Sequence, residues 1–362
     1  MRFPGFEGEW ENVTIGQICS IVGGGTPDTN TKEYWNGDIQ WFTPSEVGKE
    51  KYVSDSNRTI SIDGLKNSSA KLLPPYSILL SSRATVGECS INLKKCCTNQ
   101  GFQSAVPNKD ITSTEFLYYR LLSHKRELIK KACGSTFLEI SAKQIAKFNT
   151  YLPTKSEQDK IASLLSLIDE RISIQNKVIE KYESLIKALA YEILGKHTPN
   201  ITLSECVRCT SSTLKESDLA KAGTIPAYGA AGISGFTESA LTMGDSILIT
   251  KDGSGIGSLR YVSGPHSFVG TLNSMTSKDG VYLPYIYYAL QNVCFESYRT
   301  GQAIPHIYFK DYGKETVYCP SLDDQKRLAK GLEMIDDKIE IEKAILNSLQ
   351  SLKAHLLSVL FI

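Results

Sequence analysis

The stretch that decides the fold is EQDKIASLLSLIDERISIQNKVIEKYESLIKALAYEIL, from Glu157 to Leu194. Apolar side chains recur along it at alternating intervals of four and three residues, which is the spacing of a coiled-coil seam. The seam positions include Ile161, Leu165, Ile168, Ile172, Ile179 and Ile186. Charged residues stand between them, so the stretch predicts one long helix that packs along one face against another helix.

The same pattern returns 167 residues further on, where Leu328 matches Ile161. The apolar positions of this second stretch include Leu328, Leu332, Ile335, Ile339 and Leu346. The lead-in repeats as well, because Pro153 and Gln158 are matched by Pro320 and Gln325. A repeat of this period indicates two half-molecules, each made of a globular segment and one long helix.

We expect the domains to follow this repeat. The predicted division is a first globular domain at 1–152, a spacer helix at 153–195, a second globular domain at 196–319 and a C-terminal spacer helix at 320–362. If the ends of the second globular domain lie close together, the two helices must pair antiparallel. The expected fold is therefore α/β or α+β, with two similar domains separated by antiparallel coiled-coil helices and related by a pseudo-two-fold axis.

The seam is interrupted at equivalent polar positions, Gln175 and Glu342, while Lys353 stands opposite Ile186 as one further departure. We expect the two polar side chains to lie near each other or near the middle of the helix pair, where a polar pair fixes register. Each helix, about 38 residues long, would span roughly 57 Å. Two similar heads at a set distance suit a periodic ligand with two-fold symmetry such as B-DNA, so we expect two short sequence elements separated by an unread spacer.

Composition limits the other classes of function. The chain has 362 residues, 41% of them hydrophobic, and a net charge of +1, which argues against a strongly polybasic nucleic-acid binder. The N-terminus lacks a signal-peptide pattern and no apolar run approaches 18 residues, so the sequence predicts a soluble protein with no membrane partner. Nine cysteines with a single C-x-x-C, at Cys206 and Cys209, favour reduced thiols in the cytoplasm over a metal site.

Local patterns predict two further kinds of element. Thr14 to Ser20 and Ile201 to Val207 are predicted as the opening strand of each globular domain. Glu115 to Lys131 is predicted as one amphipathic helix, within a segment from Arg120 to Lys147 that holds seven basic and two acidic residues. We expect any polyanion on this segment, although a solvated helix face explains the same run. The phosphate-contact candidates are Lys125, Arg126, Lys130, Lys131, Lys143 and Lys147.

Several motifs, in this order, resemble the specificity subunit of type I restriction-modification systems. They are RFPGF from Arg2, YWNGDIQWFTPSEV from Tyr34, SSRATVG from Ser81, TNQGF from Thr98, GSTFLEI from Gly134, and the repeated P-x-x-x-x-Q-x-x-[IL]-A before each helix. The resemblance implies two target-recognition domains that each read half of a bipartite DNA sequence. It also implies two spacer helices that bind two modification subunits, which carry S-adenosylmethionine and methylate adenine; a restriction subunit can join them. The chain itself would bind no cofactor. The second domain departs from the pattern, since Leu272-Asn273 is its nearest match to NQGF.

Base readout is expected where the two halves differ, because two heads with different half-sites cannot share discriminating side chains. The shared glycines, Gly87 with Gly257 and Gly134 with Gly301, more readily explain turns. The candidates for DNA contact are polar loop residues, each of which could equally be exposed without a contact. In the first half they are Ser82, Arg83, Thr85, Gln100, Gln103, Ser135 and Thr136; in the second half they are Lys251, Asp252, Ser254, Gln302 and His306.

Catalysis is the rival class of function. Gly253 to Gly257 resembles a phosphate-binding glycine loop but is not followed by G-K-[ST]. Leu73-Pro74-Pro75-Tyr76 lacks the polar first residue of an adenine methyltransferase signature, and the histidines show no nucleophile-base spacing. We therefore expect no catalytic residue and no metal in this chain. The alternatives left open are a coiled-coil adaptor with two protein-binding heads, and an enzyme whose site has no signature here.

Overall fold

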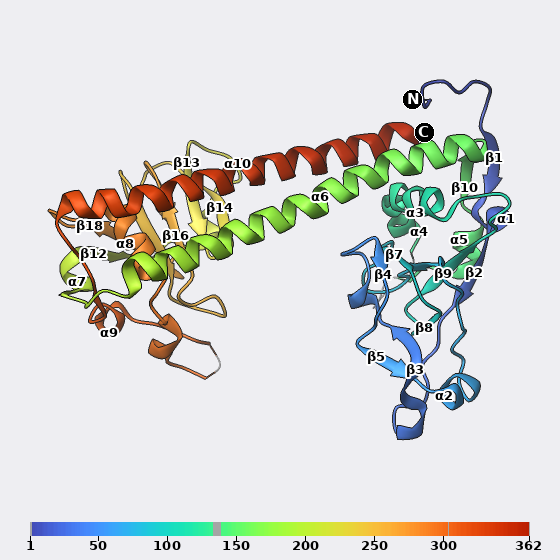
Figure 1. Ribbon diagram of the computed structural model, residues 1–362, viewed down its shortest axis with the longest axis horizontal. Helices are drawn as coiled ribbons and strands as arrows, with labels where there is room; N and C mark the ends of the chain where they lie inside the picture. Colours follow the sequence, from blue (N-terminus) through green and yellow to red (C-terminus); the bar gives the residue numbers. More distant parts are fainter. Residues whose placement is uncertain (1, 133–138, 303, 362) are drawn as a thin grey trace. The chain divides into compact units, whose positions relative to one another are not determined.

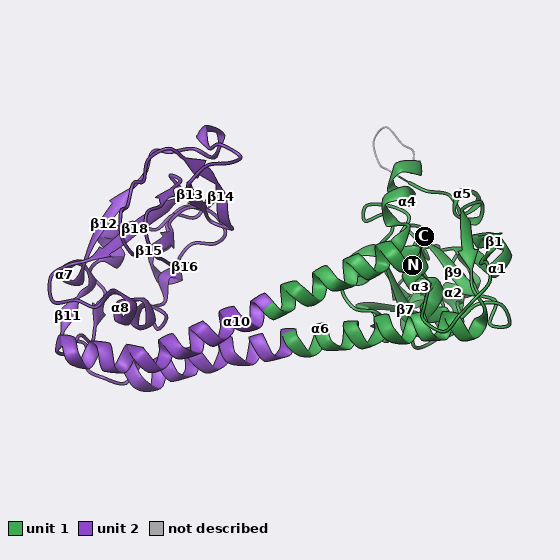
Figure 2. Cartoon of the chain, turned by 90° about the horizontal axis from the view of Figure 1, so that it is seen from above, with its two compact units in different colours: residues 1–175, 345–362 green, residues 176–344 purple. Residues whose placement is uncertain are grey.

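The computed structural model describes residues 2–132, 139–302 and 304–361 (Figure 1). The chain forms two compact units, one of residues 1–175 and 345–362 and one of residues 176–344 (Figure 2). Each unit therefore contains part of both long helices, α6 (Lys155–Ala190) and α10 (Leu322–Leu360). The division of the chain at the ends of these helices stays a prediction.

Unit 1 is a mixed domain with one larger sheet. Its elements are β1 (Glu11–Thr14), α1 (Ile15–Ile18), β2 (Cys19–Gly23), β3 (Trp35–Phe42), β4 (Tyr52–Val53), β5 (Arg58–Ile60), α2 (Ile62–Lys66), β6 (Ile78–Leu80), β7 (Cys89–Asn92), β8 (Cys96–Thr98), β9 (Gln103–Pro107), α3 (Thr114–Ser123), α4 (Lys125–Lys131), α5 (Ala142–Ala146) and β10 (Asn149–Leu152). The larger sheet has the order β2-β9-β6-β7-β4, beside a sheet β5-β3-β8 and the pair β1-β10. Four of its strands are antiparallel to their neighbours, and β4 joins the edge parallel to β7.

Unit 2 repeats this plan in shorter form. Its elements are β11 (Ile201–Thr202), α7 (Leu203–Cys206), β12 (Val207–Ser211), β13 (Ile225–Gly229), β14 (Gly232–Thr237), β15 (Ser246–Thr250), β16 (Leu259–Val262), β17 (Ser267–Phe268), β18 (Leu272–Ser277), α8 (Leu283–Leu290), α9 (Phe309–Tyr312) and β19 (Thr316–Val317). The sheet β12-β18-β15-β16 matches β2-β9-β6-β7 strand for strand, but within the described residues β16 is an edge strand because nothing takes the place of β4.

The two long helices run antiparallel inside each unit. In unit 1 the Lys353 ammonium lies 2.6 Å from the Asp169 carboxylate, and Leu360 packs in the core with Ile161. In unit 2 the Lys343 ammonium lies 3.7 Å from the Glu183 carboxylate. The predicted fold class, two similar α/β domains with antiparallel long helices, is confirmed by this arrangement and by the solved structures described below.

None of the predicted seam side chains is exposed. The buried ones are Ile161, Leu165, Ile168, Ile179, Ile186, Leu332 and Ile339, and the half-buried ones are Ile172, Leu328, Ile335 and Leu346. Of the two polar interruptions, Glu342 is 8% exposed with its carboxylate 2.6 Å from the Lys338 ammonium, and Gln175 is half-buried. Their proximity to each other stays a prediction, because they belong to different units.

The repeated lead-in glutamine fastens each long helix to its own domain. In unit 1, Gln158 is 1% exposed; its Nε2 donates to the carbonyls of Pro153 (2.9 Å) and Ile111 (3.1 Å), and its Oε1 accepts from the Ser113 amide (3.0 Å). In unit 2, Gln325 makes the same three bonds, to the Pro320 carbonyl (2.8 Å), the Gly280 carbonyl (3.3 Å) and the Tyr282 amide (2.8 Å). The P-x-x-x-x-Q motif thus satisfies buried backbone groups at a helix start.

Both predicted opening strands are wrong in the same way. A helical turn interrupts each: α1 after Thr14 and α7 after Thr202. Thr14 with Gln17, and Thr202 with Glu205, form capping boxes, and these reciprocal bonds stabilise a turn of helix where the apolar residues alone suggested a strand.

The single helix predicted over Glu115 to Lys131 is also wrong. It is two helices, α3 and α4, that meet at His124. The Ser123 hydroxyl donates to the Arg120 carbonyl at 2.8 Å, a carbonyl that also accepts from the His124 amide at 3.2 Å. A serine hydroxyl that shares the helix carbonyl in this way favours an end or bend of the helix.

Candidate nucleic-acid interface

Three loops of unit 1 meet at one place, and we call them the reading loops: residues 81–87, 99–103 and 139–140. Main-chain bonds join them, since the Ser82 amide donates to the Gly101 carbonyl (2.8 Å) and the Ile140 amide donates to the Ser82 carbonyl (3.2 Å). Their positions follow from the sheet, because residues 81–87 connect β6 to β7 and residues 99–103 connect β8 to β9. The structure therefore brings together the predicted segments SSRATVG and TNQGF.

An ion pair within the reading loops holds the Arg83 side chain. The Arg83 guanidinium lies 2.9 Å from the Glu139 carboxylate, and both side chains stay partly exposed, at 44% and 38%. The carboxylate leaves part of the guanidinium fork available, so Arg83 is oriented by Glu139 and still has donors for a ligand.

The polar candidates of these loops differ in accessibility. Thr85 and Gln100 are exposed, the Thr85 hydroxyl donating to the Ser81 hydroxyl at 3.0 Å and the Gln100 amide oxygen accepting from Thr26. Ser82 is fully buried and its hydroxyl makes no hydrogen bond to any described residue, so it supports the loop and does not face a ligand. Gln103 is half-buried, and its Oε1 likewise lacks a partner within the described ranges.

Unit 2 builds the same cluster from residues 250–257, 270–273 and 305–307, its own reading loops. The Lys251 amide donates to the Thr271 carbonyl (2.9 Å), and the Ile307 amide donates to the Lys251 carbonyl (2.9 Å), as Ile140 does to Ser82. Lys251 is half-buried and Ser254 is exposed. The two domains thus share the loop framework in spite of different loop sequences.

The side-chain pair across the loops differs between the units. Asp252 stands where Arg83 stands and His306 where Glu139 stands, and the His306 Nδ1 lies 2.5 Å from the Asp252 carboxylate. A guanidinium suits the two acceptors of guanine, whereas a carboxylate accepts from the cytosine amino group. The main-chain frameworks of the two sets of reading loops are therefore alike, but unit 1 presents a guanidinium and unit 2 presents a carboxylate.

A basic surface adjoins the unit 1 loops. Gly87, at φ +85°, lets the chain pass close to Lys125, because a Cβ there would lie 2.8 Å from the Lys125 side chain. The Lys125 ammonium pairs with the Glu88 carboxylate. The remaining phosphate-contact candidates are exposed on α4, on α5 and directly after α5: Arg126, Lys130, Lys131, Lys143 and Lys147. The two helices are joined where the Gln144 Nε2 donates to the Lys131 carbonyl at 3.1 Å.

The remaining candidates for DNA contact are Ser135, Thr136 and Gln302. Ser135 and Thr136 lie outside the described residues, as does Gly134, whereas Gln302 is exposed. In unit 2, Gly257 at φ +79° approaches Phe295 where Gly87 approaches Lys125, so an aromatic side chain replaces a basic one beside the loops. Gly301 lies at φ +80° and sets a turn.

Sequence reasoning missed Glu139 and Thr26. Both act through side chains far away along the chain, on Arg83 and Gln100. A signal for Glu139 did exist, since it matches His306 at the repeat distance and GSTFLEI is one of the quoted motifs.

A metal centre requires several ligating side chains close together. No group of three or more His, Cys, Asp or Glu side chains in the ranges that the structure describes could hold a metal ion. The described cysteines are unpaired, and five of them, Cys19, Cys89, Cys96, Cys97 and Cys206, are buried. Among the helices described, none is long and apolar enough to cross a membrane.

Comparison with protein families identifies the class. Residues 7–184 and 202–351 match the family model described as the type I restriction modification DNA specificity domain. The chain belongs to this family, and it carries the domain twice. The resemblance found in the sequence motifs is confirmed.

The individual proteins to which the chain is similar are named as specificity subunits. The MjaIX specificity subunit of Methanocaldococcus jannaschii is 37% identical over 180 residues, 48% of this chain and 41% of that protein. The EcoprrI specificity subunit of Escherichia coli is 22% identical over 363 residues, 92% of this chain and 88% of that protein. In the matches to the MjaIX and the EcoR124I/EcoR124II subunits, the chain spans 41% and 48% of the relative, less than half of each.

The fold matches solved structures over its whole length. The S subunit of a type I restriction-modification system from M. genitalium superposes with a TM-score of 0.63 at 22% identity, covering 100% of this chain and 99% of that one. A second chain, from a study of complex assembly and conformational transition of the type I R-M system, gives a TM-score of 0.59 at 16% identity.

Proposed function

We propose that this chain is the DNA-specificity subunit of a type I restriction-modification complex. Each head would read one half of a bipartite duplex site, and α6 and α10 would set the unread spacer. One observation carries the proposal: equivalent main-chain bonds join the reading loops in both heads, and these loops present opposite charges, Arg83 in one head and Asp252 in the other. That is what two readers of different half-sites require.

The proposal assigns roles to the side chains. Arg83, Thr85 and Gln100 would face base edges in the first half-site, and Lys251, Asp252 and Ser254 in the second. The exposed basic side chains of α4 and α5 would contact phosphates, which position the protein without reading sequence. His306 would orient Asp252.

The partners follow from the family. Two modification subunits would bind the long helices, bring S-adenosylmethionine and methylate adenine, and a restriction subunit could join them. The chain itself would be a non-catalytic subunit that binds no cofactor, and it would act in the cytoplasm, where its DNA is.

Methylome sequencing of host cells with and without this chain tests the proposal directly. The expected result is a bipartite methylated motif with a fixed spacer that disappears with the chain. In vitro, the complex with its modification subunits should bind this duplex selectively, with affinity that falls steeply as salt rises. A complex without sequence-selective duplex binding would instead favour the adaptor with two protein-binding heads, and methylation by the chain alone would favour an enzyme.

A further inference from the structure

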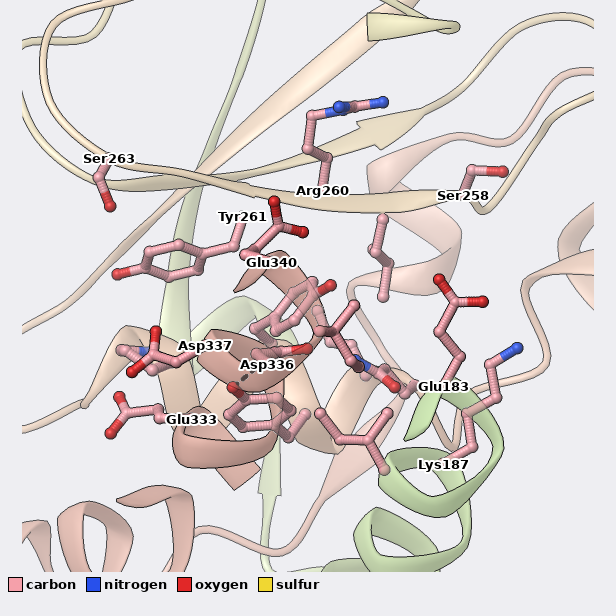
Figure 3. A pocket seen from close by; sticks show the side chains of 18 of the residues that line it. Glu183, Lys187, Ser258, Arg260, Tyr261, Ser263, Glu333, Asp336, Asp337 and Glu340 are labelled. Carbon is pink, nitrogen blue, oxygen red and sulfur yellow. Dashed lines mark hydrogen bonds between the residues drawn. The ribbon is translucent and has the colours of Figure 1, made fainter. Parts of the chain in front are cut away.

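Unit 2 contains a pocket of about 1080 Å³ between α8, β16 and its parts of the two long helices (Figure 3). Tyr261, Tyr287 and Tyr288 form its aromatic walls. The charged side chains that line it comprise three cations and five carboxylates, the latter being Glu183, Glu333, Asp336, Asp337 and Glu340. The pocket therefore has an excess of negative charge.

The cations of the pocket leave Asp336 without an ion pair. Lys343 lies 3.7 Å from Glu183 and 3.1 Å from Glu340. The Arg260 guanidinium lies 6.0 Å from the Tyr228 ring and points away from Asp336 (Figure 3). Asp336 accepts a hydrogen bond from the Tyr288 hydroxyl at 2.7 Å but pairs with no lysine or arginine among the described residues. Burial raises the pKa of this carboxyl, which reflects its poor compensation.

Unit 1 fills the equivalent place with two lysines. The Tyr119 hydroxyl donates to Asp169 at 2.6 Å, as Tyr288 does to Asp336. The Lys353 ammonium lies 2.6 Å from the same Asp169 carboxylate. The Lys51 ammonium donates to the Ser166 hydroxyl (2.6 Å) and to the Tyr119 hydroxyl (3.2 Å), and lies 4.8 Å from the Tyr119 ring. Unit 1 thus holds one lysine on the Asp169 carboxylate and a second lysine on the hydroxyl and ring of Tyr119.

Unit 2 has the equivalent tyrosine and carboxylate, Tyr288 and Asp336, but its described residues provide neither of the two lysines. Ile186 stands where Lys353 stands, and Glu333 stands where Ser166 stands, so one cation is replaced by an apolar side chain and one hydroxyl by a carboxylate. Lys51 directly precedes β4, the edge strand that unit 2, as far as it is described, does not have.

No described strand of unit 2 covers the edge that β4 covers in unit 1. The Ile91 amide of β7 donates to the Lys51 carbonyl at 2.7 Å. Tyr261 of β16 occupies the place of Ile91, because it pairs with Ile247 as Ile91 pairs with Ile78. The main-chain N–H and C=O groups of Tyr261 therefore point away from β15. An added strand would pair with them at this edge of the sheet, beside the pocket.

We propose that an extended segment of a protein partner adds to the edge of β16 and places a lysine or arginine side chain against Tyr288, Glu333 and Asp336. Strand addition supplies main-chain bonds, and the pocket supplies selectivity for a cation. The inference rests on the proposed function for the partner, which we take to be the modification subunit. The two modification subunits then bind unequally, because unit 1 already holds its own lysines.

The affinity of the full-length chain for purified modification subunit, measured by titration calorimetry, tests the pocket. The variants are Asp336→Asn and Glu333→Gln, which keep an oxygen to accept from Tyr288 and Tyr282 and so preserve the internal bonds. Removing one side of a desolvated charge pair is expected to weaken binding of one modification subunit about tenfold or more.

The control is Asp323→Asn, which removes the same charge from the first turn of α10, outside the pocket lining. It should bind as the wild-type chain does, and thermal unfolding should show all three variants folded. Binding of both pocket variants within about twofold of wild type overturns this inference alone. A wild-type chain that does not bind the modification subunit overturns the proposed function and this inference with it.

Discussion

Arg83 and Asp252 occupy the same place in two loops that are built alike, and each is held across the loops by a side chain, Glu139 for Arg83 and His306 for Asp252. At the residue scale the heads therefore present different groups at this place, a guanidinium in unit 1 and a carboxylate in unit 2. The pairing is partly exposed, so its own contribution to stability is small, and its effect is to hold one orientation of the reading side chain.

Replacing Arg83 by Ala should reduce discrimination at the first half-site only. A lost bidentate contact to a base costs about 1–3 kcal/mol, so affinity for the cognate duplex should fall about 5- to 150-fold. Glu139→Gln should have a smaller effect in the same direction, because Arg83 remains but loses its orientation. Competition binding with duplexes altered in either half-site measures both.

Lys94→Ala is the matched control. Lys94 follows the C-terminal end of β7, whereas the loop of residues 81–87 precedes the N-terminal end of that strand, and the Lys94 ammonium lies 2.7 Å from the Asp55 carboxylate. It should leave both half-sites unaffected. Loss of discrimination at the second half-site in Arg83→Ala would contradict the assignment of heads to half-sites.

Cys319 has unusual chemistry for a cysteine in this chain. A hydrogen bond from the Cys206 thiol lowers the pKa of Cys319 to about 7. Its thiolate population should therefore rise as pH passes through about 7, and alkylation by iodoacetamide, followed by mass spectrometry, should rise over the same range. Cys206→Ala removes the donor and should move the profile to higher pH; an unchanged profile would show that Cys206 does not control this thiol.

At the scale of elements, the lead-in motif acts through hydrogen bonds that no periodicity reveals. Gln158 and Gln325 each satisfy three backbone groups at the start of a long helix. These bonds fasten the start of each long helix to its own globular domain.

Gln158→Ala and Gln325→Ala should each destabilise their own unit. Truncation leaves buried backbone groups without partners, which costs about 1–3 kcal/mol each. Chemical denaturation, read with hydrogen exchange to resolve the two units, measures the loss. Gln350→Ala, at an exposed position of α10, is the control and should change stability little, because alanine is a good helix former. Equal stability of Gln158→Ala and Gln350→Ala would rule out the anchoring role.

The elements that the sequence predicted wrongly had local signals of their own. T-x-x-Q at Thr14 and T-x-x-E at Thr202 are capping boxes, which outweighed the apolar residues that suggested strands. The break at His124 depends on the side chain of Ser123, whose choice of partner is not visible in a hydrophobic pattern.

At the scale of the whole molecule, each long helix contributes to both units. The length of the proposed DNA spacer depends on how many helix residues separate the two globular domains. Four residues inserted after Gln175, together with four after Ala344, add one turn to each helix at the boundary of the units. At 1.5 Å per residue this adds about 6 Å, or roughly two base pairs of spacer.

Methylome sequencing of cells that carry this variant should show both half-sites unchanged and a spacer longer by about two base pairs. The same four residues inserted after Gly264, a turn glycine with open space around it, provide the control and should leave the spacer unchanged. A spacer of unchanged length in the helix variant would disprove the idea that the helices set this distance.

The sequence by itself determined the repeat, the two long helices and their antiparallel pairing, because heptad spacing is local and the chain connection leaves few other arrangements. It also indicated the loops that carry the candidate DNA contacts. The tertiary structure decided which of these side chains are available: Ser82 is buried, and Arg83 and Asp252 are held by Glu139 and His306. It also showed how the two halves differ at the pocket, since the lysines of unit 1 come from the residue before an edge strand and from a long helix distant in sequence. Such contacts join residues far apart in the chain, and their geometry depends on the packed sheet and not on any local pattern.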